Sequence, residues 1–249
     1  MSPQSGGAWQ RRTMVGTQPS QKLGICLEVC AVVAAAIVSK LLLDQVFWRF
    51  SGPVSLIALL ALLTIYLRGK GINWTDLGLR LPAGRRGWLL LLPQALLAVF
   101  AILLAGAGTA LVGAALGFDF MAEVPDGVDE RWGDVAGNMP RYLMWLSIGI
   151  LSGGFAEEMF FRSYLISRLR EGFGGGRIAA VLAVLLSAAF FGYGHVYYQG
   201  LKGFITTGAI GLALGFLYLL YRRNLWPLIV AHAFVDSLAF TATYAGWDI

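Results

Sequence analysis

Phe155-Ala156-Glu157-Glu158-Met159-Phe160-Phe161-Arg162 is a charged stretch inside an otherwise apolar segment. The flanking residues, 142–150 and 164–166, are mostly apolar. Ionisable side chains at membrane depth are costly, so each one is by default a candidate for a functional site. Because it has two carboxylates and one guanidinium in this position, the stretch is the leading candidate for a functional site in the chain.

The spacing of these three charges separates the two acids. Glu158 and Arg162 are four residues apart and share one face of a helix, so they are predicted to pair. Glu157 points about 100° away from that face, which leaves its carboxylate free. The alternative is that all three side chains form one structural ion cluster that clamps neighbouring helices.

The chain has two histidines, and both lie in strongly apolar segments. His195 ends the apolar run 190–195, and His232 lies four residues before Asp236, on the same helix face. A lone buried histidine is most often a satisfied core residue. At a rise of about 1.5 Å per residue, both histidines and Glu157 fall within the bilayer, where there is almost no other charge. A shared buried cavity with an active site is therefore predicted.

Composition defines the class of protein. Of the 249 residues, 57% are hydrophobic and 13% are charged, and the mean hydropathy is +0.68. A water-soluble domain of this length does not need so much apolar surface, so we predict an all-α, polytopic transmembrane helix bundle with about seven to eight spans. The formal charge of +5 does not indicate nucleic-acid binding, because the basic residues fall in short loops between the spans.

Seven apolar segments are predicted to cross the membrane: 23–43, 52–67, 87–117, 141–166, 177–196, 203–221 and 225–244. The third is longer than the roughly 20 residues that a span requires, so it is either one long helix or a broken one. The basic connector 68–86 is expected to lie on the membrane surface with Trp74 as its anchor. The acidic loop 118–140 is expected to be solvated.

The ends of the chain and its basic residues predict an orientation. Residues 1–22 are polar and rich in Gly, Ser and Gln, which is typical of a disordered tail. Most loop Lys and Arg residues fall on one side when this tail is cytoplasmic, which predicts a multi-pass protein with its N-terminus inside and residues 118–140 outside. Glu28, near the inner end of the first span, is expected to reach the interface.

Three motifs in a fixed order resemble a known family. Glu-Glu-x-x-x-Arg at 157–162, Phe-x-x-x-His at 191–195 and His-x-x-x-Asp at 232–236 resemble the intramembrane proteases of the CAAX-protease and bacteriocin-processing family, also called CPBP or Abi. Asp-Leu-Gly-Leu at 76–79 resembles a segment often seen ahead of that core. The resemblance covers about residues 72–240, and its specific part is 147–240. The length of the chain allows a single transmembrane domain, predicted at 23–249, with a protease-like core at about 141–244.

The resemblance also implies a role for each residue of the site. In the family, the first Glu activates a water with help from the first His, which makes Glu157 the general base and His195 its partner. The second His and the residue four positions later stabilise the oxyanion, which assigns this part to His232 and Asp236. Many members have Asn in place of Asp236, and an ionised Asp cannot donate a hydrogen bond. Asp236 is therefore either a protonated donor beside His232 or an ionised group that orients it.

The function implied by the resemblance is an intramembrane endopeptidase similar to the type II CAAX prenyl proteases. It would hydrolyse a peptide bond with a Glu/His-activated water, while Glu158 and Arg162 hold the geometry. The implied partners are a membrane protein or lipidated peptide as substrate and the lipid bilayer, with no nucleic acid and no cofactor. The expected location is a bacterial plasma membrane.

Three alternatives stay open. A zinc protease would use an N/O ligand set, although no His-Glu-x-x-His is present; its ligands would be Glu157, Glu158, His195, His232 and Asp236. A non-proteolytic membrane scaffold or a bacteriocin self-immunity protein would not need Glu157. A transporter would use the buried acids as a proton relay, but the sequence has no repeated hydropathy halves.

Overall fold

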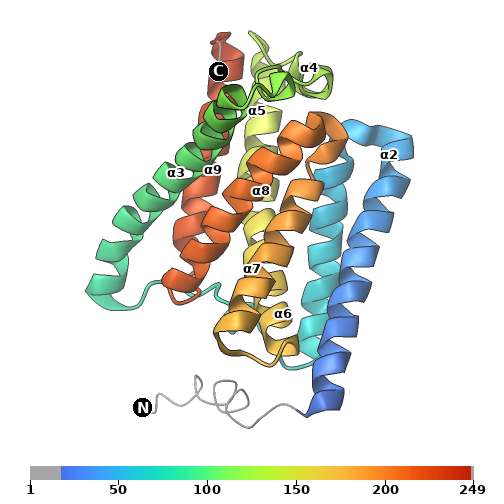
Figure 1. Ribbon diagram of the computed structural model, residues 1–249, viewed down its shortest axis with the longest axis vertical. Helices are drawn as coiled ribbons and strands as arrows, with labels where there is room; N and C mark the ends of the chain where they lie inside the picture. The colour runs from blue at the N-terminus through green and yellow to red at the C-terminus, as the bar shows by residue number, and fades with distance from the viewer. Residues whose placement is uncertain (1–17, 248–249) are drawn as a thin grey trace.

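The protein is all-helical in the computed structural model, which describes residues 18–247 (Figure 1). Within those residues, five helices are long and apolar enough to cross a membrane. They are α2 (Pro19–Gly69), α3 (Gly84–Ala115), α7 (Gly176–Tyr193), α8 (Val196–Leu220) and α9 (Trp226–Ala245). The predicted all-α membrane bundle is therefore confirmed.

A further helical column runs without a break from Met139 to Gly172. It consists of α5 (Met139–Ile148), η2 (Gly149–Ile166) and α6 (Ser167–Gly172). The middle part is a π-helix, a wider form that occurs frequently at functional sites. The charged stretch at 155–162 lies within it, and no pattern in the sequence predicted the widening.

The first two predicted spans are the two legs of α2. The helix folds at Phe47, whose φ of −154° and ψ of 69° are not helical. Figure 1 shows the first leg (blue) rising and the second (cyan) returning beside it. The helix begins at Pro19, so the last residues of the predicted tail are helical, while residues 1–17 of that tail lie outside the described part of the chain.

The long apolar segment at 87–117 is one continuous helix. α3 runs for 32 residues with Pro93 inside it, which corresponds to about 48 Å at the α-helical rise. This length exceeds the roughly 30 Å of a bilayer core, which a tilted helix accommodates. Figure 1 shows α3 inclined against the other helices.

The connector between α2 and α3 packs part of its length against the bundle, which the sequence did not predict. Leu77 is fully buried, and its carbonyl oxygen accepts hydrogen bonds from the hydroxyls of Ser163 and Tyr218. Trp74 donates from Nε1 to Thr64 Oγ1 at 2.9 Å. Contacts with distant helices, which local composition does not reveal, therefore hold part of the connector against the bundle, while its position relative to the membrane surface stays a prediction.

The loop at 118–140 is also more ordered than predicted. It contains the short helices η1 (Asp119–Met121) and α4 (Asp126–Trp132), and its side chains Met121, Arg131 and Val135 are buried. Figure 1 shows α4 at the end of the bundle opposite the α6–α7 and α8–α9 turns. The loop therefore covers one end of the helices rather than lying free in solvent.

Candidate active site

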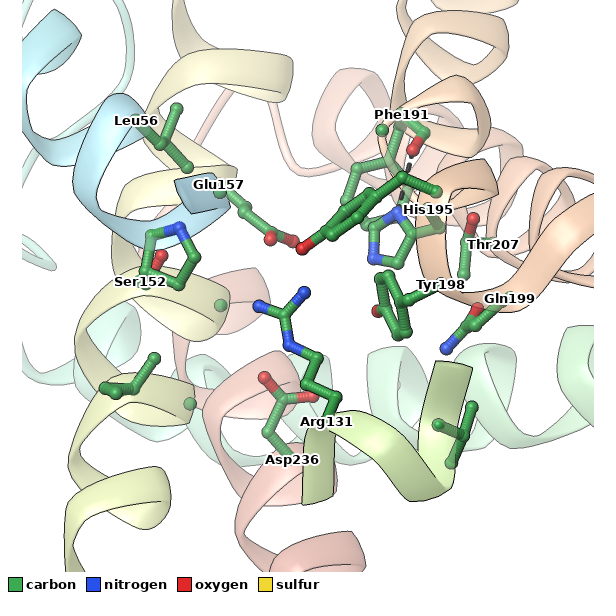
Figure 2. Close-up of a pocket in the computed structure, with 18 of the residues that line it drawn as sticks. Leu56, Arg131, Ser152, Glu157, Phe191, His195, Tyr198, Gln199, Thr207 and Asp236 are labelled. Carbon is green, nitrogen blue, oxygen red and sulfur yellow. Dashed lines mark hydrogen bonds between the residues drawn. The ribbon is translucent and has the colours of Figure 1, made fainter. Parts of the chain in front are cut away.

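A cavity of about 1150 Å³ lies inside the bundle, with walls from α2, α4, η2, α8 and α9. The four residues predicted to act in catalysis all line it: Glu157, His195, His232 and Asp236. Figure 2 shows Glu157, His195 and Asp236 pointing into one space. The shared cavity predicted from their depths is present, while their chemical roles stay predictions.

The two adjacent glutamates have different surroundings. Glu157 lines the cavity, its side chain is 21% exposed, and it accepts no hydrogen bond from another described side chain. Glu158 is fully buried and lies behind the cavity wall, with its Oε1 at 2.9 Å from Arg162 Nη1. The pairing of Glu158 with Arg162 follows the i, i+4 spacing, and Glu157 is the acid that faces the cavity.

His232 links this glutamate pair to α9. Its Nδ1 donates to Glu158 Oε1 at 2.8 Å, so its Nε2 is the nitrogen left for the cavity side. That Nε2 lies 3.9 Å from Glu157 Oε2 and 3.8 Å from Asp236 Oδ1. A carboxylate that accepts one N–H of an imidazole fixes the orientation of the ring. Sequence reasoning missed the bond because its partners are 74 residues apart.

His195 lies at the junction of α7 and α8, where its backbone surroundings determine its tautomer. Its Nδ1 is 2.9 Å from the carbonyl oxygen of Phe191, drawn as a dashed line in Figure 2. A carbonyl oxygen only accepts, so Nδ1 carries the proton and Nε2 of the neutral ring is an acceptor. The spacing Phe-x-x-x-His thus places the histidine one turn beyond a carbonyl that holds it.

Two glycines let Asp236 approach the glutamate pair. A Cβ on Gly153 would overlap Asp236 Oδ2, and a Cβ on Gly154 would lie 2.5 Å from the Cβ of Ala233. Only residues without a side chain allow α9 to pack so closely on η2. Sequence reasoning passed over this pair, although two adjacent glycines just before the Glu pair were the available signal.

Arg131 is a site residue that sequence reasoning missed entirely. It was counted among the residues of a solvated loop, but α4 inserts it into the cavity wall, and the residue is only 4% exposed. Burial lowers its pKa below the ordinary value. Its guanidinium lies between 4.7 and 5.5 Å from the centres of four rings, those of Trp132, Trp145, Tyr197 and Tyr198.

Some N–H groups of Arg131 have no hydrogen-bond acceptor among the described residues. Nε and Nη1 have no hydrogen-bond partner within residues 18–247. Figure 2 shows the guanidinium pointing into the space that Glu157 and Asp236 also face. A buried guanidinium with unused N–H groups suits an anionic or developing negative charge in the cavity.

The zinc alternative requires a grouped ligand set. Over the described range, no three His, Cys, Asp or Glu side chains are grouped so that they could hold a metal ion. Glu158 contacts Arg162 and His232 Nδ1, so it is already engaged by the protein itself. Metal analysis of the purified protein stays the test of this alternative.

Residues 139–238 match the family model described as type II CAAX prenyl endopeptidase Rce1-like. The expected family resemblance is confirmed. The Rce1-like segment contains all three motifs, whereas Arg131 and the connector at 76–79 precede it. No curated protein and no solved structure matches the chain. At the level of the family, the match supports a CAAX-type protease, and the apolar helices indicate an integral membrane protein.

Proposed function

We propose that this protein is an intramembrane endopeptidase of the type II CAAX-prenyl-protease kind, in which Glu157 and His195 activate a water molecule. One observation carries the proposal. Glu157 presents to the cavity a carboxylate that accepts no hydrogen bond from a described side chain, while the adjacent Glu158 lies behind the wall with its Oε1 held by Arg162 and His232. A general base has to be available in this way to take a proton.

His195 suits a supporting part in this step. Its Nε2 is an acceptor, because Nδ1 donates to the Phe191 carbonyl. Two acceptors that face one space can bind both hydrogens of a single water and aim an oxygen lone pair at a peptide carbonyl. The water then loses one proton to Glu157 as its oxygen bonds to the carbonyl carbon. Glu157 afterwards returns that proton to the leaving amine.

The tetrahedral oxygen needs hydrogen-bond donors within the same cavity. His232 supplies an Nε2–H when it is protonated, because Glu158 already holds its Nδ1. Arg131 supplies Nε and Nη1. With two such donors, oxyanion stabilisation does not rest on Asp236 alone. Asp236 then acts either as a protonated third donor or as the ionised partner of His232.

The proposed substrate is a membrane protein or a lipidated peptide that enters from the bilayer. Much of the cavity wall is apolar and includes Leu56, Leu59, Phe160 and Ile210. Such a wall suits an apolar segment or a lipid chain, with a few polar groups to orient the scissile bond. We also propose a bacterial plasma membrane as the location, with a cytoplasmic N-terminus and no cofactor.

Quantitative proteomics of protein termini in the membrane fraction tests the proposal. Cells expressing wild type are compared with cells expressing Glu157→Gln, and Glu123→Gln, an exposed acid of the 118–140 loop, is the matched control. New termini should appear with wild type and with the control but not with Glu157→Gln. Identical termini in all three would favour the scaffold or self-immunity alternative, which does not need the carboxylate.

A further inference from the structure

A second pocket, of about 640 Å³, lies outside the candidate active site, and its wall is dominated by arginine. Figure 1 shows the α6–α7 turn, the α8–α9 turn and the α2–α3 connector at one end of the bundle, away from α4. These segments supply the five arginines of the pocket: Arg80, Arg170, Arg177, Arg222 and Arg223. Apart from them, Gly176, Ala180 and Leu219 complete the lining.

Among residues 18–247, no acidic side chain lines this arginine pocket, and Asp76 acts on Arg223 from outside the lining. Over the described residues, Arg80, Arg170, Arg177 and Arg222 form no ion pair with a carboxylate. Burial, together with the charges of Arg80 and Arg170, lowers the pKa of Arg223. An anion among these groups would relieve the repulsion.

Backbone contacts hold the arginines in place. Leu225 N donates to the Gly78 carbonyl at 3.1 Å, and Arg80 Nη2 donates to the Arg222 carbonyl at 3.0 Å. A Cβ on Gly78 would overlap the carbonyl oxygen of Arg223, so this close approach requires glycine. The Asp-Leu-Gly-Leu run at 76–79 thus fixes one wall of the pocket.

The turn between α8 and α9 adopts an uncommon conformation. Arg222 and Arg223 both have left-handed backbones, with φ of 53° and 63°. This region is uncommon for residues other than glycine, and such conformations persist where the surrounding structure enforces them. The turn thus places two arginines next to each other at the mouth of the α8–α9 connection, where both line the pocket.

We propose that this pocket binds a phosphate group, carried by an anionic lipid or by a free phosphate ion. Guanidinium groups match phosphate oxygens with paired hydrogen bonds, which lysine does not reproduce. The surface favours the lipid as the source. Ile178, next to Arg177, is 79% exposed, and Leu220, next to Leu219, is 57% exposed. Acyl chains would therefore find apolar helix surface directly beside the arginines.

Thermal unfolding of the purified full-length protein in detergent tests the site without any measure of proteolysis. The probes are phosphatidylglycerol, phosphatidylcholine and inorganic phosphate. Saturating phosphatidylglycerol should raise the Tm of wild type by about 5 °C, and phosphatidylcholine should not. Inorganic phosphate producing the same rise would support the site and identify the free ion as its source. No rise with either anion would overturn the proposal.

A charge-matched pair of double variants separates the pocket from general surface charge. Arg177→Gln with Arg222→Gln removes two exposed arginines that form no ion pair, so folding should be retained. Arg85→Gln with Arg86→Gln removes two exposed arginines outside the pocket, at the start of α3. Only the Arg177→Gln, Arg222→Gln variant should lose the rise in Tm that phosphatidylglycerol causes. Native mass spectrometry should also find fewer retained phosphatidylglycerol molecules on the first variant, and equal retention on the two would refute the site.

Discussion

Two groups of buried charge lie along the same helical column, and they differ in how fully their polar atoms are used. The first surrounds Glu28 of α2, whose two carboxylate oxygens accept from Arg168 Nε and Nη2, each at 2.9 Å. Lys70 Nζ adds a bond at 2.7 Å. The hydroxyls of Tyr66 and Tyr164 also donate to Glu28. These partners bury Glu28 in the protein, so that it is only 8% exposed, while its predicted depth at the membrane interface stays a prediction.

The second group surrounds Glu157, and several of its buried polar atoms have no hydrogen-bond partner among residues 18–247. Over the same described residues, Glu158 Oε2 and Arg162 Nη2 have no hydrogen-bond partner, while Arg162 Nη1 forms the ion pair with Glu158 Oε1 at 2.9 Å. Nε and Nη1 of Arg131 also have no hydrogen-bond partner among these residues. Nearly all buried polar groups in folded proteins are hydrogen-bonded, so such atoms need an explanation. The comparison teaches that buried charge indicates a site most strongly where bonding capacity is left for a ligand.

The strongest test of this contrast is Glu157→Gln. Because the carboxylate accepts no hydrogen bond from a described side chain and its contact with His232 is long, at 3.9 Å, the exchange should leave the Tm nearly unchanged. Cleavage should fall at least about 10²-fold for lack of a base. The measurement is turnover of the substrate found by proteomics, together with thermal unfolding. A folded, inactive Glu158→Gln beside an active Glu157→Gln would mean that the two acids have been assigned backwards.

Arg131 provides the next largest expected effect. If its guanidinium stabilises the oxyanion, Arg131→Met should lower kcat by roughly 10²–10³-fold, while Arg131→Lys should recover part of the rate. The apolar stem of Met preserves much of the packing against the four rings. Full activity of a folded Arg131→Met protein would reduce the residue to a packing role.

The two alternatives for Asp236 predict different outcomes for two variants. Asp236→Leu should lose activity whichever alternative holds, by up to roughly 10²-fold. Asp236→Asn should stay active if the group is a protonated donor, and should resemble Leu if it is an ionised partner of His232. Comparing both variants between pH 6 and 9 on one substrate decides between the alternatives.

Mutations in the fully hydrogen-bonded group around Glu28 should change the stability of the protein rather than its catalytic activity. Arg168→Met leaves a buried carboxylate with weaker compensation, which should cost about 3–5 kcal/mol. Adding Glu28→Gln should recover part of this loss, and activity per folded molecule should stay near wild type. A selective loss of activity with normal stability would show that this cluster also takes part in function.

Lys70 should give the smallest effect. Its side chain is 45% exposed, so Lys70→Met should cost less than about 1 kcal/mol. Burial alone would lower its pKa, but hydrogen bonds with Glu28 and Tyr66 outweigh burial and raise it above 10.5. Because the folded pKa is the higher one, the contribution is present below pH 10.5 and is lost as pH rises through the folded pKa. The Tm difference between the two proteins should therefore shrink in strongly alkaline buffer.

Helical periodicity made part of the site predictable. The contact of Glu158 with Arg162, the free direction of Glu157 and the common depth of the two histidines all follow from helix geometry. The bond from His232 to Glu158 and the contact of Glu28 with Arg168 do not, because they join residues 74 and 140 positions apart. The insertion of Arg131 depends on how a loop packs over the helices, and its acidic composition gave no sign of that.

The walls of the candidate active-site cavity come from two parts of the chain, one inside the Rce1-like segment and one before it. The motif residues lie within 139–238, whereas α2 and α4, which supply Leu56, Leu59 and Arg131, lie before that segment. Mutations in the N-terminal half can therefore reshape what fits the cavity without disturbing the groups that would cut the bond. Such a division would allow substrate specificity to change during evolution while the motif residues stay the same. Relatives with identical motifs therefore need not share a substrate.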